Sequence, residues 1–244
     1  MPRSNASRAA FVVVVAGALA VAVGCGNDSP KPVPTPSPGV LVVPTVRSTD
    51  AGIARIQEYV ERRTQANDID TKKPEWRTRL PLRPSVQLDA AKAYVWTLTT
   101  DAGSLQIRLR ADRAPSHVAT VVYLTLLGFF DGLSIHTIVP GKALESGDPA
   151  DDGKGSPGFA LSPEASDAKH DRRGLVSAVS QGPSTDDSKF RITFAADPSL
   201  DPINTIFGEV EAGLDILGKL EALGTASGRP STRVTILKAT ISIR

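Results

Sequence analysis

The sequence predicts a mainly β chain that forms a closed antiparallel barrel. Two helices cap the barrel, and an N-terminal extension precedes it. Three observations support this fold class. Short runs rich in β-branched and aromatic residues recur between clusters of Gly, Pro and Asp, at residues 97–100, 104–109, 135–139, 175–180, 191–194, 205–210 and 233–243. Two segments among them, near 115–127 and 214–223, read as helices. A Pro-rich stretch at 29–44 separates this region from an apolar N-terminus.

The first two runs read as a hairpin that leads into the first helix. Gly103 supplies the turn, and the run at 104–109 alternates polar and apolar residues. Pro115 favours a helix start, and Val118 and Val122 recur at helical spacing before Gly128 ends the helix. We expect this helix to cover a sheet or barrel.

Composition limits the possible functions. The chain has 244 residues, 41% of them hydrophobic, with a formal net charge of +2. That is enough for one core plus extensions, and so small a charge gives no reason to expect nucleic acid as a partner. Asp148, Asp151 and Asp152 could suggest calcium, but we expect no metal and no cofactor.

Several segments resemble the cyclophilin family in the right order and at its usual spacings. FFDGLSIHTIVPGKALESGD at 129–148 is similar to the signature F-H-R-x-x-x-x-F-x-x-Q-G-G-D after an aromatic-Asp-Gly turn. GLVSAVSQGPSTDDSKFRITF at 174–194 and LDPINTIFGEVEAGLDILGKLEAL at 200–223 match two later family patterns. The resemblance implies a cyclophilin-like barrel of about eight strands over 93–244. It also implies peptidyl-prolyl cis-trans isomerase activity, with proline-containing peptide segments as substrates.

The resemblance also places the site residues, most of which are substituted. His136 remains, while Thr137 stands where the family has its catalytic arginine. Lys142 and Arg191 replace aromatic residues of the proline pocket, and Glu145 replaces a glutamine. The expected peptide groove comprises Ala143, Val179, Ser180, Lys189, Leu200 and Asn204.

These substitutions predict isomerase turnover that is weak or lost. Prolyl rotation without the arginine keeps most of its barrier of about 18–20 kcal/mol, because a well-placed donor is typically worth about 3 kcal/mol. Thr137 is too short to replace it. Two alternatives remain open: Arg191 could act as a relocated arginine, or the domain could be a non-catalytic binding or scaffold module.

The N-terminus indicates export and lipid anchoring. Arg3 and Arg8 precede an apolar run at 9–24 that ends at Cys25, the only cysteine, and small residues before a cysteine resemble the bacterial lipobox. We therefore expect a signal peptide at 1–24 and a lipidated Cys25 opening a tether at 25–47. The protein would be a monomer on a bacterial membrane, facing the periplasm or the exterior, among envelope proteins. An ordinary signal peptide or an uncleaved anchor is the alternative.

Between tether and barrel, residues 48–92 predict a short helix and an extended arm. Asp50 could cap the helix, in which Ile53, Ile56 and Val60 share one face. Apolar residues spaced among prolines follow, and we expect this arm to pack on the barrel, with peptide binding as the alternative. We expect both His117 and His170 at the surface.

Overall fold

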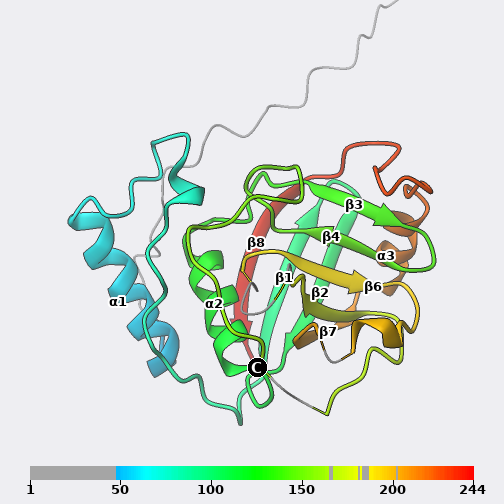
Figure 1. Ribbon diagram of the computed structural model, residues 1–244. Helices are drawn as coiled ribbons and strands as arrows, with labels where there is room; N and C mark the ends of the chain where they lie inside the picture. Colours follow the sequence, from blue (N-terminus) through cyan, green and yellow to red (C-terminus); the bar gives the residue numbers. More distant parts are fainter. Residues whose placement is uncertain (1–47, 165–166, 181, 183–186, 202) are drawn as a thin grey trace, which may run out of the picture. The chain divides into compact units, whose positions relative to one another are not determined.

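The protein is described here by a computed structural model that covers residues 48–164, 167–180, 182, 187–201 and 203–244. In this part of the chain, eight strands form one antiparallel sheet in the order β3-β4-β6-β5-β7-β2-β1-β8 (Figure 1). The strands are β1 Tyr94–Thr100, β2 Gly103–Leu109, β3 Ile135–Val139, β4 Ala143–Ser146, β5 Leu175–Ala178, β6 Phe190–Thr193, β7 Ile206–Ala212 and β8 Ile236–Ile243. The α-helices are α1 Ala51–Gln65, α2 Pro115–Leu126 and α3 Leu214–Glu221. Two 3₁₀ turns lie at Trp76–Thr78 and Pro198–Leu200.

The mainly β class is confirmed, but the closed barrel is not. The two end strands of the order, β3 and β8, meet through one isolated bridge between Ser134 and Thr235 within the described residues. Beside it, Ile135 N donates to Val234 O at 2.9 Å. These contacts involve the first residue of β3 and residues just before the two strands, so the curled sheet touches itself at one corner and no ladder forms along β3 and β8.

The hairpin of β1 and β2 shows why the chain turns where the sequence predicts. Gly103 has a φ of +131°, which a residue with a side chain rarely adopts. A Cβ at this position would also collide with Ile216 of α3. The glycine therefore lets the hairpin turn and lets α3 pack closely against it.

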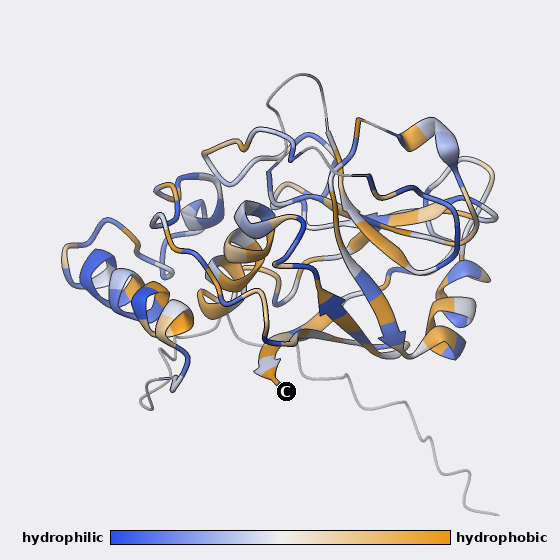
Figure 2. Cartoon of the chain, turned by 90° about the horizontal axis from the view of Figure 1, so that it is seen from below, coloured by the Kyte–Doolittle hydropathy of each residue, from blue (hydrophilic) through white to orange (hydrophobic). Residues whose placement is uncertain are grey.

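An aromatic cluster fills the interior of the curled sheet. The ring of Trp96 on β1 lies 5.0 Å from that of Phe130 and 4.9 Å from that of Phe190 on β6, edge to face in both cases. All three side chains are buried. Apolar residues also run along α2, as Figure 2 shows, and this helix packs against β7, β8 and α1. Helix α3 contacts β2, β3 and β4.

The segment before β1 packs on this domain through several specific contacts. Asp50 accepts a hydrogen bond from Ile53 N at 2.9 Å and so caps α1. In the arm that follows, Arg77 donates from Nε to Phe129 O at 2.8 Å and from Nη2 to Asp131 O at 2.7 Å. Tyr123 of α2 donates its hydroxyl to Pro81 O at 3.0 Å. The arm is thus held to the turn that leads into β3 and to α2.

The expectation that His117 and His170 lie at the surface is wrong. Both are buried. His117 Nδ1 lies 2.5 Å from Glu164 Oε2, and His170 Nδ1 lies 2.6 Å from Asp201 Oδ1. A buried imidazole is tolerated where a carboxylate meets its ring nitrogen, and here both carboxylates come from distant loops.

Candidate functional site

Three of the predicted site residues lie in one row across the sheet. Thr137 of β3 pairs with Glu145 of β4, and Glu145 pairs with Arg191 of β6. The row continues to Ser177 of β5, which the sequence reasoning missed. Directly opposed residues of antiparallel strands point to the same face, so the row forms one polar surface of the sheet.

An ion pair occupies the middle of this row. Glu145 Oε1 accepts hydrogen bonds from Arg191 Nε at 3.1 Å and from Nη2 at 2.5 Å. The Arg191 and Glu145 side chains are only 14% and 23% exposed, so water screens the pair little. Separating the two would leave each charge partly buried without its partner, which is unfavourable. The guanidinium is therefore committed to Glu145.

The neighbouring strand residues His136 and Thr137 contact each other. His136 Nδ1 lies 2.9 Å from Thr137 Oγ1, and the tautomer of the ring decides which atom donates. A Cβ added at Gly228 would lie 3.4 Å from Thr137 Cγ2, so the loop that carries Gly228 passes close to the threonine methyl. The Thr137 side chain is short, and its hydroxyl already has a partner.

A cavity of about 610 Å³ opens beside Thr137 and Glu145. Its other walls are two loops, at 151–153 and 227–233, which the sequence reasoning did not include in the site. Arg233 Nη1 donates to Asp151 Oδ2 at 3.1 Å and so joins the two loops. Gly228 and Pro230 do mark a turn in the sequence, but nothing local places that turn beside β3.

Strand β3, with His136 and Thr137, thus lines a partly polar groove. A comparison with protein families agrees with this arrangement. The family model described as "Cyclophilin type peptidyl-prolyl cis-trans isomerase/CLD" matches residues 95–241. The chain belongs to this family.

Several known cyclophilins are similar to this chain. Peptidyl-prolyl cis-trans isomerase CYP18-1 of Arabidopsis thaliana is 33% identical over 150 residues, which are 59% of this chain and 94% of the plant protein. Peptidyl-prolyl cis-trans isomerase-like 2 of Cryptococcus neoformans is 35% identical over 159 residues. That match covers 62% of this chain but 28% of the fungal protein. A crystal structure of a cyclophilin type isomerase from Cryptosporidium parvum superposes with a TM-score of 0.59 at 28% identity. It covers 62% of this chain and 98% of its own.

Two further cyclophilin positions lie at the turn between β3 and β4. Lys142 is exposed and Ala143 is half-buried. Gly141 makes the turn with a φ of +72°, and its N–H donates to Glu221 Oε1 at 2.9 Å. The ammonium group of Lys142 is therefore in water, at the position where the resemblance expects an aromatic ring.

Lys189 lies in the interior, although the resemblance places it in the groove. Its side chain is 2% exposed, and Nζ donates to Asp187 Oδ2 at 2.6 Å and to Gly155 O at 2.5 Å. Burial raises the pKa of Asp187, against the opposing effect of the hydrogen bonds from Lys189. The residue ties the loop after β4 to the segment before β6, and no sequence signal shows this.

The remaining groove positions lie together at the ends of β5 and of the second 3₁₀ turn. Ser180 N donates to Asn204 Oδ1 at 3.2 Å, and Asn204 Nδ2 donates to Leu200 O at 3.2 Å. Val179 is buried beside them, and its N–H donates to Lys189 O at 3.1 Å. The amide of Asn204 thus joins two segments of the groove wall.

The acidic loop after β4 is organised by one carboxylate. Asp148 accepts backbone hydrogen bonds from Ala150 at 2.8 Å, from Asp152 at 2.9 Å and from Gly153. In the described part of the chain, no group of three or more His, Cys, Asp or Glu could hold a metal ion. None of the described helices is long and apolar enough to span a bilayer.

Proposed function

We propose that this chain is an exported, lipid-anchored cyclophilin that holds proline-containing segments of envelope proteins, with isomerase turnover that is weak or absent. It acts as a monomer. The observation that carries this proposal is the ion pair of Arg191 and Glu145 beside Thr137. Thr137 is short, and Arg191, the guanidinium of the row, is held by Glu145.

The chemistry of the reaction explains why this pair matters. An isomerase lowers the barrier by stabilising a twisted amide, and the interaction must be stronger in the transition state than in the ground state. Thr137 has a short side chain whose hydroxyl contacts His136. Arg191, the one guanidinium in the row, is bound to Glu145 and would have to leave it before it could reach a substrate.

Binding of proline-containing segments has separate support. The Cryptosporidium parvum relative was also crystallised in the presence of the dipeptide Ala-Pro. In this chain, Leu200 is half-buried and still provides apolar surface at a groove position, next to the amide of Asn204. An active isomerase is the second candidate, and membership of the family favours it.

A protease-free isomerisation assay separates the two candidates. Exchange between the cis and trans forms of an Ala-Pro peptide is measured by NMR with full-length protein, beside its Arg191→Ala and Arg79→Ala variants. Arg79 is an exposed arm residue and serves as the matched control. We expect little catalysed exchange in all three. Appreciable turnover that Arg191→Ala alone removes would make Arg191 a relocated catalytic arginine and end the proposal of a weak site.

Lipid anchoring is tested on the intact chain expressed in a bacterium. Because the apolar run at 9–24 ends at Cys25, we expect the protein to incorporate labelled fatty acid and to enter the detergent phase. Cys25→Ser removes the label. Unlabelled wild-type protein recovered in the aqueous phase contradicts the anchor without affecting the proposal for the groove.

A further inference from the structure

A charged trough lies along β2 and β7 and the loops beside them. It consists of two cavities of about 370 and 250 Å³ that share Arg110 and Glu209 in their walls. Six cationic and four acidic side chains line the trough, which leaves an excess of two positive charges. The cationic residues are Lys92, Arg108, Arg110, Arg113, Lys169 and Arg172.

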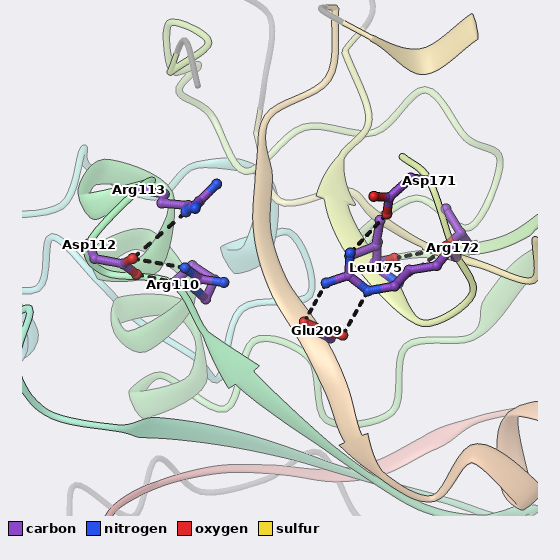
Figure 3. A network of polar contacts seen from close by, with 8 residues as sticks. Arg110, Asp112, Arg113, Asp171, Arg172, Leu175 and Glu209 are labelled. Atoms are coloured by element: carbon purple, nitrogen blue, oxygen red, sulfur yellow. Dashed lines mark hydrogen bonds and ion pairs between the residues drawn. The ribbon is translucent and has the colours of Figure 1, made fainter. Parts of the chain in front are cut away.

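Each acidic side chain of the trough forms an ion pair with an arginine, and three arginines are shared among the four carboxylates. Figure 3 shows Arg172 between Asp171 and Glu209, with ion pairs of 2.8 and 2.9 Å. Arg110 pairs with Asp112 at 2.9 Å. Arg113 pairs in the same way with Asp167. These groups are exposed or half-exposed, so each ion pair contributes little and an arginine can exchange its partner at little cost.

Two cations remain without an ion pair in the described structure. Arg108 lies directly opposite Glu209 in the ladder of β2 and β7. The Glu209 carboxylate is nevertheless held by Arg172 through Nε at 3.0 Å and Nη2 at 2.9 Å, which leaves the Arg108 guanidinium free of it. Lys169 is exposed and likewise has no acidic partner within ion-pair distance.

One end of the trough adjoins the place where the described chain begins. Lys92 lines the trough and forms an ion pair of 2.7 Å with the helix cap Asp50. Asp50 and Lys92 also line the next cavity along, of about 430 Å³. In the sequence, Asp50 stands 25 residues after Cys25. A chain of that length spans at most about 80–90 Å, so the trough stays within that distance of anything that holds Cys25.

We propose that this trough docks on the anionic phospholipid headgroups of the membrane that holds the chain. Guanidinium groups match phosphate geometry, and several exposed cations spread over one surface suit many separate headgroups better than one deep-bound anion. A basic surface beside a lipid anchor adds an electrostatic attraction to the membrane of about 1 kcal/mol per lysine or arginine that lies near it. The inference rests on the proposed lipid anchor, which brings the trough to the membrane.

Lysine footprinting on vesicles tests the docking. Full-length acylated protein is reconstituted into vesicles of phosphatidylcholine, alone or mixed with phosphatidylglycerol, and treated with an uncharged acetylating reagent before mass spectrometry. We expect Lys92 and Lys169 to react at least fivefold more slowly on the anionic vesicles, roughly the effect of one cation near such a surface. High salt should restore their reactivity without releasing the protein. The exposed residues Lys72 and Lys219 should not change.

A double variant shows whether the trough is responsible. Arg108→Gln with Lys169→Gln should abolish the protection of Lys92, whereas Arg79→Gln with Lys72→Gln, an equal loss of charge on the arm, should not. Equal reactivity of Lys92 on both kinds of vesicle overturns the proposal, and so does equal protection of Lys72. Protection by soluble polyglutamate but not by vesicles also overturns it, because the partner is then an acidic chain. Failure to float with neutral vesicles would instead contradict the lipid anchor.

Discussion

The two faces of β3, β4 and β6 carry different kinds of side chain. The inward face carries Ile138, Leu144, Phe190 and Ile192, all at most 2% exposed. The outward face carries the row of Thr137, Glu145 and Arg191. Phe190 and Arg191 are adjacent in the chain, yet one belongs to the aromatic core and the other to an ion pair in the groove.

This difference shows that the fold and the reaction depend on separate side chains of the same strands. Alternation along a strand sends neighbouring residues to opposite faces. Apolar packing on the inward face maintains the sheet, so residues of the outward face can be exchanged while the strands stay paired. A cyclophilin fold therefore does not by itself show that isomerase activity is present.

The largest expected effect comes from breaking the inward face. Phe190→Ala should lower the free energy of unfolding by about 3–5 kcal/mol, because it leaves a cavity beside Trp96 and Phe130. Urea unfolding followed by circular dichroism measures this loss. The comparison variant is Arg191→Ala at the next position, where we expect a smaller loss of about 1–3 kcal/mol, because Glu145 loses its partner but stays partly in contact with water. Equal losses for the two variants would mean that the groove face also supports the fold.

Rebuilding the outward face should raise activity without changing the fold. We expect Thr137→Arg, Lys142→Phe, Glu145→Gln and Arg191→Phe together to increase the isomerase rate by at least about a hundredfold, the value of a positioned donor. Thr137→Arg alone should do much less, since the substrate would lack a pocket that holds its proline ring. The protease-free assay measures both. An unchanged rate in a folded quadruple variant would show that the groove frame is not intact.

A smaller effect concerns the loop that covers the start of α2. Burial alone would raise the pKa of Glu164, but hydrogen bonds from the His117 ring and from the N–H groups of Ser116 and His117 hold it below its usual 4.5. A lowered carboxyl pKa contributes stability above the unfolded-state pKa, and that contribution is lost as the pH falls through the folded-state pKa.

Glu164→Gln should therefore cost about 1 kcal/mol near neutral pH, a usual value for a helix cap. The cost should shrink as the pH falls below about 4.5, where the carboxyl of the unfolded chain becomes protonated, and it should vanish once the folded carboxyl is protonated as well. Urea unfolding at a series of pH values measures the difference. The exposed Glu75→Gln variant is the control and should show no such trend. A cost that is independent of pH would mean that Glu164 acts only by packing.

Much of the fold, and the set of residues that form the row across the sheet, could be predicted from sequence patterns. The pattern at 135–139 gives β3 with its observed bounds, and Pro115 and Gly128 bracket α2 as predicted. β4 was missed because its four residues contain a single large apolar side chain, Leu144, which is too little for a periodic signal. The motif spacing aligned Thr137, Glu145 and Arg191, and the sheet brings these three together.

By itself, the sequence determined which elements form and which side chains occupy the positions of a cyclophilin site, because these depend on periodicity, turn residues and motif spacing. Only the tertiary structure decided which partners those side chains have. Lys189 is a buried link to Gly155, and His170 is buried against Asp201. Arg191 donates a hydrogen bond to Glu145, and Glu209 accepts one from Arg172 although Arg108 lies opposite it. Each of these contacts joins residues at least 31 positions apart, and local patterns cannot specify pairings over such separations.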